Sequence, residues 1–353
     1  MSLSFRHDTL GQRVRFGSGQ AAEALAAEVE EGGWSRVMVV AGASEAELAA
    51  RVTGGLPVAH VHDEVVMHVP VPVAERARAA AAAHDADVLV SVGGGSTTGL
   101  AKAVALTTGL PIVAVPTTYA GSEATNVWGL TEGSTKTTGV DPRVLPRTVV
   151  YDASLTLSLP VGLSVASGLN ALAHCVDSMW SPHTDPIDQA LATEGIRALD
   201  AGLPRVAADP TALEGREETL YGAYLSAVAF ASAGSGLHHK ICHVLGGRYD
   251  LPHAPTHAIV LPHVLALNGP AAPAADARIA RAFGADDGLA GLQRLRARLD
   301  APRALRDVGL EESQIPDAAR AILPVVPPSN PADVGVEVLG DLLRRAWEGA
   351  DPR

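Results

Sequence analysis

Aromatic residues and cysteine are scarce in this chain of 353 residues. Phe, Trp and Tyr together make up only 4% of it, whereas alanine and glycine are abundant, so close-packed helices and tight turns are favoured over an aromatic-rich sandwich. The two cysteines, Cys175 and Cys242, are too few for a disulfide framework. This usage fits a reducing compartment, and we expect a cytoplasmic protein.

Excess positive charge and membrane-spanning runs are also missing. The net charge of −12 argues against nucleic acid or an anionic membrane as a partner. The first residues contain no apolar signal segment, and the long uncharged runs are broken by Pro or diluted by Ala, Gly and Ser. Only three lysines occur, each in a motif-like stretch where a compact charge or a tunable pKa could matter: Lys102, Lys136 and Lys240.

What is present is a large apolar fraction, 47%, on a length that suits two domains. Up to about residue 153, short apolar runs alternate with Ala-rich helical stretches, which predicts a parallel sheet with helices on both faces. The expected strands cover residues 36–43, 58–62, 87–92, 111–116 and 149–152. Beyond them, helical patterns separated by Pro and Gly dominate. We therefore predict an α/β domain over residues 1–153 and an all-helical domain over residues 154–353.

A glycine-rich turn follows the third expected strand, at Gly93, Gly94, Gly95 and Ser96. Glycines let backbone N–H groups approach phosphate oxygens, and the start of the next helix adds a favourable dipole. The pattern is neither the usual Rossmann fingerprint nor a P-loop, so a tight turn without a ligand is the alternative interpretation.

A second polar loop follows the next expected strand and offers the hydroxyls of Thr117, Thr118 and Ser122. Open α/β sheets bind nucleotides at the carboxyl ends of their strands, where this loop would lie. Lys136 comes shortly afterwards, in a stretch expected to form a hairpin or loop. Ordinary turn chemistry could equally explain these hydroxyls.

Histidines gather in the second half of the chain. Five of the thirteen lie between residues 236 and 257, with His239 and His243 four apart on one helical face and His253 on a loop or at the next helix start. Upstream, Asn170 and His174 also share one face of an expected helix. Such a cluster is typical of a site that transfers protons or binds a metal, although core histidines bonded to backbone carbonyls would give the same pattern.

Several of these motifs, in the same order, resemble the iron-containing (group III) alcohol dehydrogenase family. The resemblance rests on residues 93–96, 116–123 and 168–176 and on the histidine-rich stretch of residues 236–257, and it covers residues 7–350. It implies a dinucleotide-binding domain followed by a helical catalytic domain, an architecture shared with dehydroquinate synthase, with the site in the cleft between them. It assigns Gly93 to Ser96 to the pyrophosphate, and Thr117, Thr118, Ser122 and Lys136 to the rest of the cofactor.

The resemblance also suggests a ligand set for a metal. In metal-dependent members the ligands are one Asp and three His, and these positions fall here on Asn170, His174, His239 and His253, while His243 matches a histidine near the nicotinamide. A neutral amide therefore replaces a carboxylate, which weakens the attraction for Fe²⁺ or Zn²⁺. We expect an enzyme without a metal, although three imidazoles could still hold one.

Residues 67–70 and 128–133 resemble the branch of the family that reduces a small dianionic enone in the breakdown of aromatic compounds. For this reaction the expected catalytic residues are His243, His239, His253, His174, Asn170 and Lys240. Lys240, Arg248 or Tyr119 would hold the substrate carboxylates. The first expected strand ends without an Asp, which predicts that NADPH is tolerated beside NADH, although Glu45 could still select between them. A homodimer is expected.

Three other functions remain open. One is a metal-dependent dehydrogenase acting on a simple alcohol or aldehyde. Another is a cyclising lyase of the dehydroquinate-synthase type, whose need for several Lys and Arg is poorly met by three lysines. The third is a binding protein that kept the fold without catalysis.

Overall fold

The computed structural model describes residues 4–7, 9–133 and 135–353, and the side chains of residues 135 and 136 lie outside this description. The chain divides into two compact units, one formed by Leu10–Leu159 and the other by Pro160–Arg353 together with Met1–Thr9. The boundary predicted at residue 153 falls at the start of the short helix η4 (Ala153–Thr156), just before this division.

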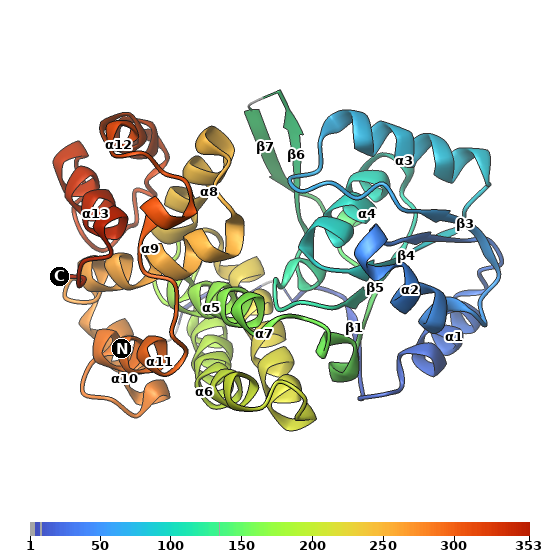
Figure 1. Ribbon diagram of the computed structural model, residues 1–353, viewed down its shortest axis with the longest axis horizontal. Helices are drawn as coiled ribbons and strands as arrows, with labels where there is room; N and C mark the ends of the chain where they lie inside the picture. The colour runs from blue at the N-terminus through green and yellow to red at the C-terminus, as the bar shows by residue number, and fades with distance from the viewer. Residues whose placement is uncertain (1–3, 8, 134) are drawn as a thin grey trace. The chain divides into compact units, whose positions relative to one another are not determined.

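The first unit is built on a parallel sheet of six strands (Figure 1). The strands are β1 (Arg13–Phe16), β2 (Val37–Val40), β3 (Val58–His62), β4 (Val88–Gly93), β5 (Ile112–Pro116) and β8 (Thr148–Tyr151). Their order across the sheet is β1-β8-β5-β4-β2-β3. The predicted parallel sheet and its five expected strands are confirmed, and β1 is an additional edge strand that the sequence pattern did not reveal.

Alternate residues of the strands point to opposite faces, and each face is covered by two helices. Val37 and Val39 share a core with α1 (Ala21–Gly32) and α2 (Ala46–Thr53). Met38 and Val40 share a core with α3 (Val71–Ala83) and α4 (Gly95–Thr108). Burial on both faces explains why these strands are continuous apolar runs in the sequence.

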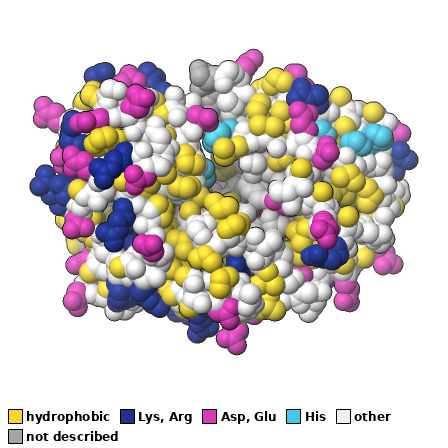
Figure 2. Space-filling model, viewed as in Figure 1, with side chains coloured by type: hydrophobic (Ala, Val, Ile, Leu, Met, Phe, Trp, Pro, Cys, Tyr) yellow, Lys and Arg dark blue, Asp and Glu magenta, His cyan; other side chains and the backbone are white. Residues whose placement is uncertain are grey.

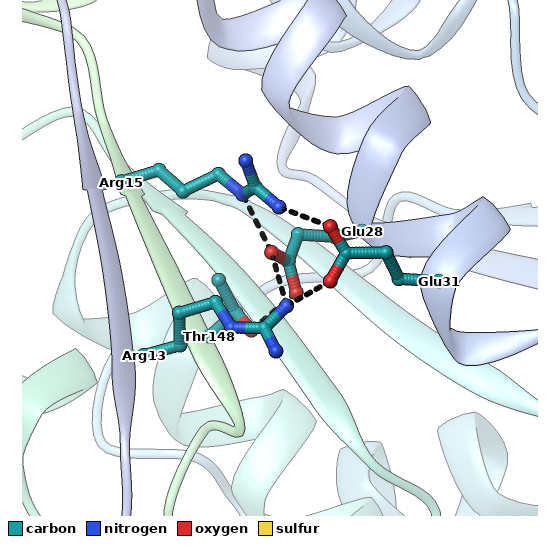
Figure 3. A network of polar contacts seen from close by, with 5 residues as sticks. All are labelled: Arg13, Arg15, Glu28, Glu31 and Thr148. Atoms are coloured by element: carbon teal, nitrogen blue, oxygen red, sulfur yellow. Dashed lines mark hydrogen bonds and ion pairs between the residues drawn. The ribbon is translucent and has the colours of Figure 1, made fainter.

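The edge strand β1 is held by charged side chains rather than by an apolar run (Figure 3). Arg13 and Arg15 lie on the same side of the strand and both donate to Glu28 of α1, at 2.9 and 2.5 Å. They also both donate to Glu31, one turn further along the helix. Glu28 is 1% exposed and accepts a third bond, 2.6 Å long, from Thr148 of β8. This network ties the helix to both strands at the sheet edge.

The second unit is helical throughout its described residues. Its helices are α5 (Val161–Ser178), α6 (Pro186–Ala208), α7 (Leu213–Ala233), α8 (Leu237–Tyr249), α9 (His253–Asn268), α10 (Pro273–Phe283), α11 (Gly288–Arg298), α12 (Ile315–Ile322) and α13 (Val336–Glu348). Helices α6 and α7 approach closely because glycines face the partner backbone. A Cβ on Gly202 would lie 2.8 Å from the amide nitrogen of Thr219, and one on Gly222 would lie 3.1 Å from the carbonyl oxygen of Gly195.

The described part of the N-terminal segment belongs to this helical unit. His7 Nδ1 lies 2.8 Å from Asp185 Oδ2, and Asp185 also caps the start of α6 by accepting from the amides of Ile187 and Asp188. None of the described helices has the combined length and apolarity that crossing a bilayer requires. On the face shown in Figure 2, acidic and basic side chains are interspersed, without the single-sign basic patch of a nucleic-acid interface.

Candidate active site

The glycine-rich turn links β4 to α4 and is shaped by close contacts. Gly93 has φ of 153°, a conformation that favours glycine. A Cβ on Gly94 would lie 3.0 Å from Thr118 Cγ2, and one on Gly95 would lie 3.2 Å from the Cβ of Ala120. The turn therefore packs against the following polar loop with no room for side chains.

Helix α4 begins at Gly95, directly after the glycine-rich turn, and Gly94 is its N-cap residue. Ser96 therefore lies in the first turn of the helix. The first N–H groups of a helix have no partner inside it, and together with the dipole they attract anions. This places Ser96 and the backbone of Gly95 where a phosphate would bind.

The turn and the polar loop meet at one point of the sheet. The connection from β2 leads outward to β3, whereas the connection from β4 leads the other way to β5, so the strand order reverses between β2 and β4. Such a reversal is where open α/β sheets bind nucleotides. The amide of Thr117 donates to Gly93 O at 3.1 Å, which joins the two loops. Thr118 and Ser122 are partly exposed beside them.

Glu45 lies close to the same reversal, in η1 (Ala43–Glu45) directly after β2. Its carboxylate accepts a 2.6 Å bond from the hydroxyl of Ser44 and lies 3.2 Å from the place of a Cβ on Gly42. An acidic group at the carboxyl end of this strand is suited to a ribose hydroxyl.

Lys102, to which the sequence assigned no role, holds the end of the polar loop through hydrogen bonds. Its ammonium is fully buried and donates to Thr125 O at 2.8 Å, Thr125 Oγ1 at 3.0 Å and Val127 O at 2.9 Å. Burial lowers the pKa of Lys102 to about 7, while the nearby Glu123 opposes this shift. A lysine inside the apolar run of a helix was the only sequence signal for this role.

Lys136, the other expected cofactor residue, lies on β7 (Thr135–Val140), which pairs with β6 (Val127–Glu132) in an antiparallel hairpin. The expectation of a hairpin or loop is met by this pair. The side chain of Lys136 is outside the described part of the structure.

In the helical unit, the expected catalytic histidines form one cluster. The ring of His174 (α5) stacks on that of His239 (α8) with centroids 4.9 Å apart. The ring centroid of His239 lies 5.0 Å from that of His257. The centroid of His257 in turn lies 4.2 Å from that of His253, the first residue of α9. His243 is 6.2 Å from His239 on the same helix. His257 lies between the others; it belongs to the histidine-rich stretch of residues 236–257, but the sequence pattern assigned it no role of its own.

Burial divides this cluster into two kinds of imidazole. His174 and His239 are 7% and 2% exposed, and burial lowers the pKa of His174 to about 4 and that of His239 well below its usual range. Both are therefore neutral near pH 7. His243 and His253 are partly exposed and reach solvent.

Asp177, one turn beyond His174 on α5, fixes the orientation of His239. Its Oδ2 lies 2.7 Å from His239 Nδ1 and accepts from the amide of His239 at 3.2 Å. Burial raises the pKa of Asp177 to about 7, opposed by the amides of His239, His238 and Gly236 and by the indole of Trp180. When Asp177 is ionised it can only accept, so Nδ1 carries the proton and Nε2 keeps a lone pair.

The positions that hold the metal in metal-dependent members of the family carry one neutral amide here, that of Asn170. Asn170 Oδ1, His174 Nδ1 and His239 Nε2 are buried without a hydrogen-bond partner among the described residues, which leaves them available as ligands. However, the amide brings no charge to a hard cation. The described chain holds two sets of three mutually close ligand atoms, and neither of them combines His174, His239 and His253.

The three residues considered for the substrate carboxylates differ in availability. Arg248 is engaged, since its Nε lies 2.8 Å from Asp317. Tyr119 is fully buried in the first unit. Lys240 lies on α8 beside His239, is partly exposed, and forms none of the ion pairs found within the described residues.

Comparison with known proteins gives consistent matches along the whole chain. The model of iron-containing alcohol dehydrogenases matches residues 11–153, and the C-terminal model of the Fe-containing alcohol dehydrogenase family matches residues 164–347. Maleylacetate reductase 2 of Cupriavidus pinatubonensis is 48% identical, over 96% of each chain.

Solved structures agree with these sequence matches. An iron-containing alcohol dehydrogenase from Corynebacterium glutamicum has a TM-score of 0.98 at 61% identity, covering 100% of this chain and 99% of its own. Maleylacetate reductase from Agrobacterium tumefaciens has a TM-score of 0.94 at 41% identity, covering 99% of this chain and 100% of its own.

Proposed function

The chain belongs to the iron-containing alcohol dehydrogenase family and is an NAD(P)H-dependent oxidoreductase, and we propose that it acts as a maleylacetate reductase. In this reaction the C=C bond of maleylacetate is reduced to give 3-oxoadipate during the breakdown of aromatic compounds. The full-length identity to maleylacetate reductases supports the assignment. The observation that carries it is the buried amide of Asn170, one turn before the neutral His174 on α5. Lys240 on α8 forms none of the ion pairs found within the described residues and is a candidate partner for an anion.

The chemistry consists of one hydride and one proton. The nicotinamide delivers the hydride to the alkene carbon β to the ketone, and the electron pair of the C=C bond moves to the ketone oxygen as an enolate. The enolate then takes a proton on the adjacent carbon, which completes the reduction and leaves NAD(P)⁺. The protein must stabilise the oxyanion and supply the proton.

We assign these two tasks to His243 and His253. Both are partly exposed, so they can exchange protons with solvent. His239 is less suited to donate a proton to the substrate, because its Nδ1–H donates a hydrogen bond to Asp177 and its Nε2 carries a lone pair. We therefore give His239, His174 and Asn170 the role of shaping the polar wall of the site. Lys240 is the group that binds a substrate carboxylate.

We propose that the reaction proceeds without a metal. The neutral amide at position 170 and the spacing of His174, His239 and His253 support this. Replacing Asn170→Asp restores a carboxylate, and we expect the variant to gain affinity for Fe²⁺ or Zn²⁺ in equilibrium dialysis. Unchanged affinity would contradict the role given to the amide.

The choice of cofactor and the state of the protein are also proposals. We propose that both NADH and NADPH are accepted and that Glu45 sets the preference between them. We further propose a cytoplasmic homodimer. The two free and buried cysteines support the location.

The decisive experiment follows NADH oxidation with maleylacetate at catalytic enzyme concentrations, with and without a chelator. We expect turnover that the chelator leaves unchanged. No turnover would refute the substrate, and turnover abolished by the chelator would refute the metal-free reaction. A His243→Ala variant with an undiminished rate would remove that residue from the mechanism.

A metal-dependent alcohol dehydrogenase is the second candidate. It is favoured by the 61% identity to a protein described as an iron-containing alcohol dehydrogenase. Oxidation of short-chain alcohols by the iron-loaded enzyme, at a rate above that of maleylacetate reduction, would favour this function over the first.

A further inference from the structure

Beside the catalytic histidines, three other ligand-type side chains meet. His238 and Cys242 are four residues apart on one face of α8, and His257 comes from α9. Their exposed fractions are 0%, 2% and 0%. The possible ligand atoms of all three lie within 4.8 Å of one another.

We propose that His238, Cys242 and His257 form a binding site for a soft metal ion of the Zn²⁺ class, separate from the positions that the family uses for iron. Imidazole and thiolate are the ligands that such ions prefer, whereas none of the family positions carries sulfur. The proposal goes beyond the reductase activity, because binding at this site does not depend on the reaction.

The distances agree with tetrahedral coordination. With Zn–N of about 2.0 Å and Zn–S of about 2.3 Å, a tetrahedral ion holds two nitrogens about 3.3 Å apart and a nitrogen and a sulfur about 3.5 Å apart. The structure has His238 Nε2 2.9 Å from His257 Nδ1 and 3.7 Å from Cys242 Sγ. The two imidazoles need to separate by only about 0.4 Å to admit an ion.

The charges around the site also suit a divalent ion. Burial, with a further contribution from Asp177, raises the pKa of the Cys242 thiol, which favours the protonated form in the metal-free protein. A bound ion displaces this proton, as metals do when they bind a cysteine. The thiolate of Cys242 and the carboxylate of Asp177 then balance the two positive charges of the ion, so little net charge is buried.

The test is a titration of the purified, chelator-treated protein with Co²⁺, read by the thiolate-to-cobalt charge-transfer absorption. We expect one equivalent to give this band, Zn²⁺ to displace it, and the Cys242→Ser and His257→Asn variants to lack it. Cys175→Ser is the matched control, because Cys175 is equally buried but faces Gly195, and it should keep the band.

Three results would overturn the proposal. The first is the absence of a thiolate band, and the second is a band that survives in Cys242→Ser. The third is cobalt that binds without giving the band and no longer binds in His174→Asn. The last result would place the ion at the family positions. If the wild type binds Co²⁺ as expected but reduces no maleylacetate, the proposed function fails and the metal site stands.

Discussion

Because the ammonium of Lys102 is buried, we expect the free energy of unfolding to rise as the pH is raised from neutral to alkaline values. The pKa of this lysine in the folded protein is about 7, compared with about 10.4 in an unfolded chain. Between these values the unfolded state binds the proton more tightly, so the free energy of unfolding rises as the pH is raised. Each pH unit contributes about 1.4 kcal/mol when the two states differ by a full proton. Between pH 7, where the folded Lys102 is half protonated, and pH 9, the gain is about 2 kcal/mol.

We therefore expect Lys102→Met to lose this pH dependence. Its stability at pH 7 alone is a poor test, because two effects oppose each other there. The variant avoids a cost of about 4 kcal/mol for burying the lysine. It also leaves the carbonyls of Thr125 and Val127 without a donor, at about 1–3 kcal/mol each.

The assay is urea unfolding at pH 7 and pH 9. The difference between the two pH values should be about 2 kcal/mol smaller in Lys102→Met than in the wild type. Lys240→Met, at a partly exposed lysine of the other unit, should keep the wild-type difference. An equal pH dependence in the wild type and Lys102→Met would refute the inference that Lys102 titrates near neutrality.

Three further variants test the site. Asp177→Asn weakens the hold on His239 and should lower kcat about 10- to 100-fold without a matching loss of NADH binding, measured by fluorescence; an unchanged kcat would contradict the orienting role. Gly94→Ala should raise the Kd for NADH, because its methyl group meets Thr118 at 3.0 Å, while Gly11→Ala, in open space, should not. Glu45→Gln should raise kcat/KM for NADPH relative to NADH, and an unaltered ratio would exclude Glu45 from cofactor selection.

The architecture of the first unit could be predicted because its strands are buried on both faces and therefore uniformly apolar. The strand β1 escaped prediction because it is held by Arg13 and Arg15, whose partners on α1 are not visible in a local pattern. The extent of helix α9 was not predicted, although its start at His253 was one of two alternatives. Its apolar residues lie on all sides and it contains Pro262, so it shows no amphipathic period and carries a residue typical of breaks.

The candidate site shows the same limit. The spacing of Asn170 and His174 on α5, and of His239 and His243 on α8, could be read from the sequence because each pair lies on one helix. Asp177 and His257 could not be assigned, because their roles arise from contacts between helices: Asp177 reaches α8 from α5, and His257 reaches His239 and His253 from α9. Helical spacing predicts which side chains share a face, but not what that face meets.

The charge of the site connects the amide at position 170 with a dianionic substrate. Two unit charges 5 Å apart, at an effective dielectric constant of 20, interact with about 3 kcal/mol. A carboxylate at position 170 would repel a substrate carboxylate at that distance by this amount unless a metal offset it. With Asn170 the repulsion is absent, the buried histidines are neutral, and the nearby Asp177 is committed to His239. Lys240 forms none of the ion pairs found within the described residues, although the chain as a whole carries a net charge of −12. In the proposed reaction, an amide at position 170 thus disfavours a metal and favours a doubly charged anion.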